Sequence, residues 1–244
     1  MKTYVINLPK DTERKTYMTK ILQEQNIKDI VFVDAIYGKN LSLQEKEQLF
    51  DSKKFTAKYA KLPNDAQIGC TLSHRKCYEE LLNSGENCCL IFEDDIVPKS
   101  SILSVTEKIE KFVTTSDEPV IILLSGWFWY TKKISIDYIL LGQLYSGFLT
   151  HSYMINEKAA KVLLEQKTYY VADDWYEFRK NLGIKIYGII PHVVNQKWDG
   201  DFKSSTESLS IKYEQGFLMT KCGLKVKGFI QKLLALCVHF EGAV

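Results

Sequence analysis

Three adjacent acidic residues follow an apolar run of the length that a buried strand needs. The run CCLIF at 88–92 ends in Glu93, Asp94 and Asp95. Like charges repel one another, so the triplet is either a solvated turn or a group that holds something positive. Hard divalent cations such as Mg²⁺ and Mn²⁺ prefer such oxygen ligands and keep open positions for phosphate oxygens. Spacing alone leaves both interpretations open.

A second acidic pair, Asp173 and Asp174, opens a segment expected to be a short helix over 171–183. Carboxylates are favoured at a helix start by the exposed N–H groups and the helix dipole, which explains one of the two. A carboxylate near an acceptor hydroxyl could also act as a general base. The neighbouring Trp175 could stack on a sugar face.

Several other polar residues could grip a phosphate or a base. Ser73 and His74 lie in "GCTLSHRK", within a helix expected over 66–84, although a helix with a basic polar face is the simpler interpretation. Arg14 follows the first expected strand. His151 and His192 are isolated, as structural histidines usually are, but His192 follows Pro191 at a strand end and is the better placed for metal or phosphate.

The elements that must position these residues alternate between strands and helices. Alternation of this kind predicts an α/β fold with a parallel sheet and helices on its faces. Ligands of such sheets bind at the carboxyl ends of the strands, where the triplet lies. We expect strands at 3–8, 30–35, 88–92, 120–124, 146–155 and 184–190, and helices at 11–25, 42–50, 66–84, 101–114 and 156–166.

The chain is expected to be one domain over residues 1–210 with a tail at 211–244. A Lys-rich connector is expected at 53–61 and a loop at 199–210. Within the tail, "LKVKGFIQKLLALCVHF" at 224–240 predicts a basic amphipathic helix. Such a helix lies in a membrane interface, or it packs on the domain or on a second subunit.

Composition limits the classes of function. The 244 residues carry a formal net charge of +2, which argues against a general nucleic-acid binder. None of the six cysteines forms a CxxC pair, so a zinc site is not expected and the compartment is expected to be reducing. The N-terminal apolar stretch is too short for a signal peptide or a spanning helix, which predicts a cytoplasmic protein.

Seven motifs, in order along residues 3–206, resemble glycosyltransferase family 25. This is the family of bacterial lipooligosaccharide transferases, often β-1,4-galactosyltransferases, to which the collagen galactosyltransferases also belong. The motifs are "VINLPKDTERK" at 5–15, "VDAIYG" at 33–38, "IGCTLSHRKCYEELLNSGE" at 68–86, "LIFEDDI" at 90–96, "SGFLTHSYMINEKAAKVLL" at 146–164, "VADDW" at 171–175 and "IIPHVVNQ" at 189–196.

The resemblance implies a GT-A-like, Rossmann-type, mostly parallel sheet and an inverting transfer from a UDP-sugar with a divalent metal, Mn²⁺ or Mg²⁺. It implies that the acidic triplet holds metal and donor, with Asp95 as first choice of metal ligand, and that Asp174, with Asp173 in reserve, is the base. The residues expected around the nucleotide or metal are Asn7, Arg14, Asp34, Ser73, His74, Glu93, Asp94, Asp95 and His192.

The implied partners are the UDP-sugar and a lipid-linked oligosaccharide acceptor, with peripheral contact to the cytoplasmic face of the inner membrane as one interpretation of the tail. Galactose is the sugar that the resemblance favours, and a glucosyl or N-acetylhexosaminyl donor is the alternative. Two other classes stay open, a glycan- or nucleotide-binding protein without turnover and a tethered scaffold. The sequence does not define the oligomeric state.

Overall fold

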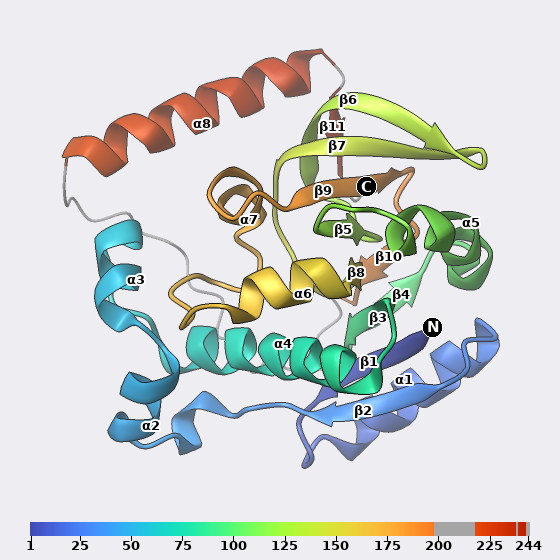
Figure 1. Ribbon diagram of the computed structural model, residues 1–244, viewed down its shortest axis with the longest axis horizontal. Helices are drawn as coiled ribbons and strands as arrows, with labels where there is room; N and C mark the ends of the chain where they lie inside the picture. Colours follow the sequence, from blue (N-terminus) through green and yellow to red (C-terminus); the bar gives the residue numbers. More distant parts are fainter. Residues whose placement is uncertain (198–217, 238, 243–244) are drawn as a thin grey trace.

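The computed structural model describes residues 1–197, 218–237 and 239–242, with the backbone alone for 218–225. In this part of the chain a nine-stranded sheet has the order β11-β6-β7-β9-β5-β8-β3-β1-β2 (Figure 1). Its strands are β1 (Lys2–Asn7), β2 (Ile30–Asp34), β3 (Cys88–Glu93), β5 (Val120–Leu123), β6 (Phe128–Ile136), β7 (Ile139–Gly147), β8 (Ser152–Asn156), β9 (Lys185–Ile190) and β11 (Phe240–Glu241). Two short strands, β4 (Ile96–Pro98) and β10 (Val194–Gln196), pair separately. The helices are α1 (Thr12–Glu24), η1 (Gly38–Asn40), α2 (Leu43–Leu49), α3 (Ser52–Tyr59), α4 (Asp65–Ser84), α5 (Ile102–Thr114), α6 (Glu157–Leu164), α7 (Trp175–Lys180) and α8 (Leu218–Leu236).

Most strands of the sheet run in one direction. β1 pairs in parallel with β2 and β3, and β5 pairs in parallel with β9. β8 lies antiparallel between β3 and β5, so its first residues meet the carboxyl ends of its two neighbours. The expected α/β fold, with a mostly parallel sheet flanked by helices, is confirmed, and the antiparallel β8 and the β6–β7 hairpin are added to it.

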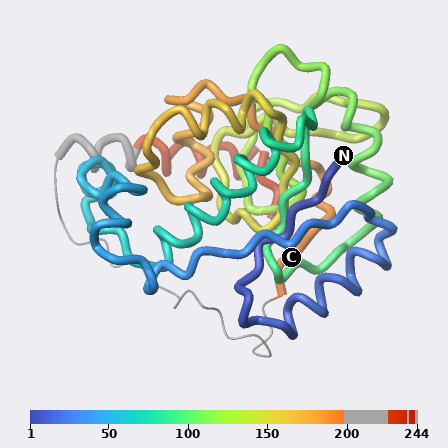
Figure 2. The backbone as a smooth tube through the Cα atoms, turned by 60° about the horizontal axis from the view of Figure 1, so that its bottom comes forward, coloured from blue at the N-terminus to red at the C-terminus, as the bar shows by residue number. Residues whose placement is uncertain are grey.

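Alternating strand residues bury the two faces of the sheet. One face packs on α4, α6 and α7, and the other packs on α1 and α5. In β5, for example, Ile121 faces the first group of helices and Ile122 the second. Apolar side chains buried on both faces of a strand are typical of a covered, mainly parallel sheet. Figures 1 and 2 show the N-terminal segment in blue along the edge that β2 forms.

Two sequence expectations about elements were wrong. The Lys-rich segment 53–61 is mostly helix α3, because Phe55 is fully buried against Phe50, Ile68 and Leu72 and so anchors it. The single strand expected at 146–155 is the end of β7, a turn and β8. Leu149 has a φ of 71° in that turn, a left-handed conformation that interrupts a strand.

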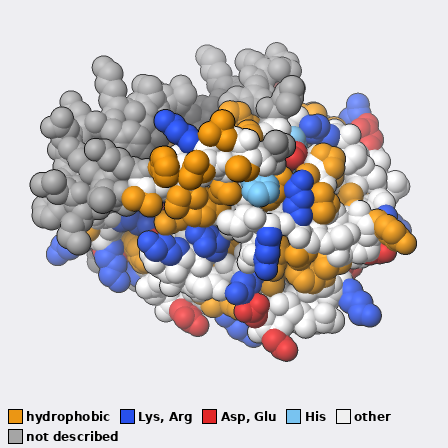
Figure 3. Space-filling view, turned by 90° about the horizontal axis from the view of Figure 1, so that it is seen from above, with side chains coloured by type: hydrophobic (Ala, Val, Ile, Leu, Met, Phe, Trp, Pro, Cys, Tyr) orange, Lys and Arg blue, Asp and Glu red, His pale blue; other side chains and the backbone are white. Residues whose placement is uncertain are grey.

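The tail contributes to the sheet through its last described residues. Phe240 pairs with Trp129 in the β11–β6 ladder, and Gln231 of α8 donates a 2.9 Å hydrogen bond to Ser146 Oγ. Among the side chains described for α8, the large apolar ones of Val226, Phe229, Leu233 and Leu236 are exposed. Figure 3 views this side of the molecule and shows apolar side chains gathered beside Lys and Arg. The domain boundary at residue 210 stays a prediction, and the loop expected at 199–210 lies outside the described residues.

Among the described helices, none has the length and the apolar composition to cross a membrane.

Two glycines allow the segment after β2 to touch α4. A Cβ on Gly69 would lie 2.5 Å from the carbonyl oxygen of Ile36 and 2.8 Å from the nitrogen of Gly38. A Cβ on Gly38 would lie 1.8 Å from the carbonyl oxygen of Asp65. Backbone atoms cannot yield as a flexible side chain can, so only glycine fits at both positions.

We therefore predict that Gly69→Ala lowers the free energy of unfolding by about 1–3 kcal/mol, the usual cost of overpacking. Gly228→Ala, on α8, is the control, because nothing lies within 4 Å of its added Cβ and alanine favours helix. Urea unfolding of both variants would measure the difference. Equal stability of the two variants would contradict the proposed contact between η1 and α4.

Candidate functional site

Two adjoining cavities lie at the carboxyl ends of β1 and β3. The first is bounded by the start of α1, the segment after β2, one face of α4 and the whole acidic triplet. The second is bounded by α4, the turn before β8 and the segment before α7. Four residues line both, namely Ala66, Cys70, Glu93 and Gln196. The triplet therefore lies at the edge of the sheet where the sequence predicts a ligand.

Asp94 binds the N-terminal segment. Asn7 Nδ2 donates a 2.8 Å hydrogen bond to Asp94 Oδ2, and Arg14 Nη1 forms an ion pair with Asp94 Oδ1. Burial raises the pKa of Asp94 above its ordinary value, although Arg14 and Asn7 act against this shift. The structure thus brings Asn7, Arg14 and Asp94 together, with both carboxylate oxygens of Asp94 engaged by protein groups.

The carboxylate of Asp95 has longer contacts with its neighbours than that of Asp94. Gln196 Nε2 lies 3.2 Å from each carboxylate oxygen, and Arg14 Nη1 lies 3.7 Å from Oδ2. Burial, followed by the charge of Glu93, raises the pKa of Asp95 from 3.8 to about 7, and Arg14 and Gln196 offset part of this rise. Burial therefore disfavours the charged form of Asp95, and a positive charge bound beside it would favour that form.

Glu93 faces α4 and the turn before β8. Thr150 donates a hydrogen bond to Glu93 Oε1, and His74 Nε2 lies 3.4 Å from the same oxygen. Burial would raise the pKa of Glu93, but the hydrogen bonds and charges of His74, Thr150 and His151 outweigh it and lower the pKa to about 2. Glu93 is therefore ionised at neutral pH, at the border of the two cavities.

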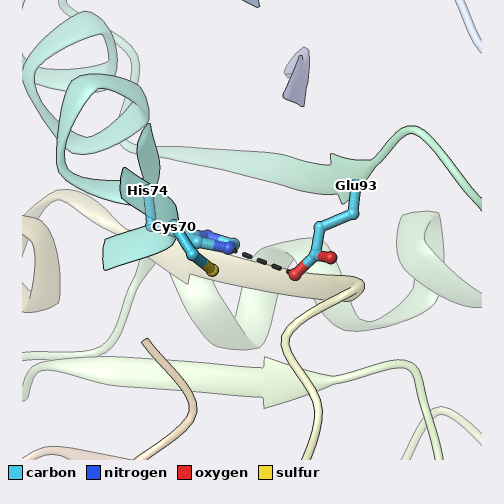
Figure 4. A group of neighbouring side chains, drawn as sticks. All are labelled: Cys70, His74 and Glu93. Carbon is cyan, nitrogen blue, oxygen red and sulfur yellow. Dashed lines mark hydrogen bonds and ion pairs between the residues drawn. The ribbon is translucent and has the colours of Figure 1, made fainter. Parts of the chain in front are cut away.

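Cys70 completes a group that sequence reasoning missed. Cys70 Sγ, a ring nitrogen of His74 and a carboxylate oxygen of Glu93 all lie within 4.8 Å of one another. Figure 4 shows the first two side chains pointing from α4 toward Glu93 of β3. The available signal was the spacing of Cys70 and His74, because residues four apart share one face of a helix.

Of two other residues expected around the nucleotide, Ser73 lines the first cavity and Asp34 does not. Ser73 lines the first cavity, where its Oγ accepts a 2.8 Å hydrogen bond from Ile36 N and donates one of 2.7 Å to Gly69 O. Ser73 thus holds the cavity wall in place. Asp34, at the end of β2, is exposed and does not line either cavity. The neighbouring residues 35–39 line the first cavity instead.

The two acids before α7 differ in surroundings. Asp174 caps α7 through a 3.2 Å hydrogen bond from Glu177 N, and its other oxygen contacts Tyr59 and Lys58. Asp173 lines the second cavity, and its Oδ2 accepts a 3.2 Å hydrogen bond from Leu149 N. Burial raises the pKa of Asp173, against the effect of that N–H group.

Trp175 does not fit the role expected from its sequence position. Its side chain is 0% exposed, it packs against Tyr153 and Phe178, and its Nε1 donates a 3.0 Å hydrogen bond to Leu149 O. The expectation that Trp175 could stack on a sugar is therefore wrong. The residue instead fixes the turn that carries Leu149.

The two isolated histidines are both buried. His192 Nδ1 lies 2.6 Å from Glu241 Oε1, its Nε2 lies 2.8 Å from Asn195 Oδ1, and the residue lines neither cavity. His151 lines the second cavity, and neither of its ring nitrogens forms a hydrogen bond with a described residue. Burial lowers the pKa of His151 to about 4, although Glu93 acts against this shift.

Comparison with known sequences assigns the family. Residues 1–176 match the family described as "Glycosyltransferase family 25 (LPS biosynthesis protein)". The chain belongs to this family and is a glycosyltransferase. A Haemophilus influenzae protein, named provisionally as a glycosyltransferase, is 29% identical over 217 residues, which is 84% of this chain and 74% of that protein. The family suggested by the sequence motifs is thereby confirmed.

Solved structures show only distant similarity. The protein A197 from STIV is 14% identical, with a TM-score of 0.40 over 77% of this chain and 81% of that chain. An apo UDP-glucose pyrophosphorylase is 10% identical, with a TM-score of 0.40 over 81% of this chain and 92% of that chain. Scores of this size support no conclusion about function.

The raised pKa of Asp95 predicts a pH effect on stability. Between its ordinary pKa of 3.8 and the folded value of about 7, the folded chain binds a proton that the unfolded chain has lost. This carboxyl group therefore makes the free energy of unfolding fall as the pH rises through that window. Asp95→Asn removes the effect, and we expect it to stabilise the protein by about 2 kcal/mol near pH 8.

Denaturant unfolding across the pH range would measure this difference. Below the lower pKa the two proteins should converge, because the carboxyl group of Asp95 is then neutral in both states. The control is Asp117→Asn, at a fully exposed side chain, which should show no such trend. A stability difference for Asp95→Asn that does not change with pH would contradict the assignment.

Proposed function

We propose that this glycosyltransferase moves galactose, with inversion, from UDP-galactose to a terminal sugar of lipooligosaccharide, in a reaction that requires Mn²⁺ or Mg²⁺. The observation that supports the proposal is the pair of cavities that meet at Glu93, one rimmed by the acidic triplet and the other by Asp173. A transferase needs two substrates side by side, with the reacting groups at the junction.

The first cavity suits the nucleotide half of the donor. Arg14 and Lys39 line it and supply positive charge, and Tyr37 offers an aromatic ring. Asp95 and Glu93 offer the carboxylate oxygens that would hold the cation. A divalent cation held there would stabilise the charge that develops on the departing diphosphate.

The second cavity suits the acceptor sugar. An inverting displacement needs the acceptor hydroxyl opposite the departing UDP, with a base within hydrogen-bond reach. We assign Asp173 as the base and Asp174 as a structural residue, which reverses the order of preference drawn from the sequence. Asp173 lines the cavity and its raised pKa makes it a stronger proton acceptor, whereas Asp174 is engaged by α7, Tyr59 and Lys58.

A lipid-linked acceptor would be presented at a membrane surface. The apolar row on α8, with Phe229 63% exposed and Leu236 80% exposed, supports a peripheral contact with that surface. Amphipathic helices bind interfaces through such a face.

The assignment of the base predicts different outcomes for two isosteric variants. Asp173→Asn should lower kcat by about 100-fold or more, the usual contribution of a general base, while donor binding is retained. Asp174→Asn should keep most of the activity, because asparagine caps a helix as well as aspartate does. Turnover and UDP-sugar affinity of both variants would be measured. A larger loss of kcat in Asp174→Asn would exchange the two roles.

The donor and the metal requirement are tested by UDP release. Purified protein would be incubated with a panel of UDP-sugars and acceptors, with and without Mn²⁺. We expect release from UDP-galactose that needs the metal, is lost in Asp95→Ala and persists in the surface variant Asp117→Ala. Release from UDP-glucose or a UDP-N-acetylhexosamine would identify that sugar, in place of galactose, as the one transferred. UDP binding without turnover of any donor in the panel would overturn the proposed reaction.

A further inference from the structure

Three side chains of different chemistry converge at the border of the two cavities. Cys70 and His74 are one turn apart on α4, and Glu93 ends the neighbouring strand β3. Figure 4 shows the thiol, the imidazole and the carboxylate turned toward a common point. The backbone of Glu93 pairs with Ile6 of β1, but none of the three side chains caps a helix.

Buried tyrosine hydroxyls fix the orientation of the His74 imidazole. His74 Nδ1 lies 2.8 Å from the hydroxyl of Tyr153, and that hydroxyl lies 3.0 Å from the hydroxyl of Tyr78. All three residues are buried. Histidines that bind metals are usually held in this way through the ring nitrogen that does not bind the metal, and the other nitrogen then faces the ion.

The carboxylate is oriented as well, because Thr150 donates a hydrogen bond to Glu93 Oε1. The distance of 3.4 Å between His74 Nε2 and Glu93 Oε1 is long for a hydrogen bond. It matches the separation of about 3.3–3.6 Å between two ligands of a tetrahedral zinc ion with bonds of about 2.0–2.3 Å. A short movement of Cys70 Sγ would complete three corners of such a site.

We propose that Cys70, His74 and Glu93 form a binding site for a borderline transition-metal ion of the Zn²⁺ class. Three protein ligands with a fourth position open to the cavities are the arrangement of accessible zinc sites. A thiolate and an imidazole select such ions over Mg²⁺ and Mn²⁺, which prefer oxygen ligands. The site therefore differs in chemistry from the all-oxygen triplet.

Binding would form a bond between the metal and Cys70 Sγ and release the thiol proton to solvent. Burial raises the pKa of this thiol well above its ordinary value, so the metal must displace the proton. Removing this proton costs free energy, so Cys70 should bind metal more weakly than a cysteine that is already a thiolate.

A consequence follows if the proposed function holds. Glu93 would belong both to this site and to the oxygen-ligand site of the donor, so Zn²⁺ at Cys70 would withdraw it from the donor's cation. Zn²⁺ would then inhibit a Mn²⁺-dependent turnover, and Cys70→Ala would relieve that inhibition. Metal binding itself does not depend on turnover, so failure of one proposal is distinguishable from failure of the other.

Cobalt(II) is the probe, because its bond to a thiolate gives a charge-transfer absorption and its tetrahedral sites absorb strongly in the visible. We expect one equivalent to produce both bands in the intact protein. Cys70→Ala should lose the thiolate band, and Cys237→Ser, at an exposed cysteine away from the cavities, should retain it. Zn²⁺ should then displace the cobalt and abolish the bands.

Tyr153→Phe tests the site without removing a ligand. Loss of the hydroxyl behind His74 should weaken Zn²⁺ affinity by about 10–100-fold, the usual effect of removing such a partner. Circular dichroism would establish that each variant is folded. If Cys70→Ala does not fold, His74→Gln provides a second test. The absence of a thiolate band in the intact protein would overturn the proposal, as would a band that survives Cys70→Ala.

Discussion

The repulsion among three consecutive carboxylates, of which Asp94 is buried and the other two are partly buried, is the constraint on which this end of the molecule depends. The three carboxylates have different sets of neighbours, and Arg14 is shared by Asp94 and Asp95. Glu93 contacts α4 and the turn before β8, Asp94 contacts β1 and α1, and Asp95 contacts β10 and α1. An isolated buried charge would cost several kcal/mol, which gives each of these contacts a structural purpose.

The same constraint explains why segments that are distant in sequence meet here. Asn7 reaches Asp94 across 87 positions, and Gln196 reaches Asp95 across 101. The antiparallel β8 brings Thr150 to Glu93, which a parallel strand at this place would not do. The two glycines, Gly38 and Gly69, then fix the remaining wall by direct contact between η1 and α4.

The parts that the sequence predicted are those with a local signal. The apolar run before Glu93 and the helical pattern of α4, which ends at Gly85, both define their elements without knowledge of the partners. The direction of β8 was not predictable, because its fully buried apolar run has the same pattern as that of its neighbour β5, which pairs in parallel with β9. Gln196 was missed because β10 has three residues, too few for a periodic signal. Asp173 and Asp174 share one local pattern, and only their tertiary partners separate them.

The shared wall between the cavities has a consequence for the order of events. Glu93, Cys70 and Gln196 line both spaces, so a ligand that shifts any of them in one cavity changes the affinity of the other. Such a free-energy coupling is reciprocal, whichever ligand arrives first. Two ligands bound side by side would therefore influence each other's affinity through this shared wall, even without direct contact between them.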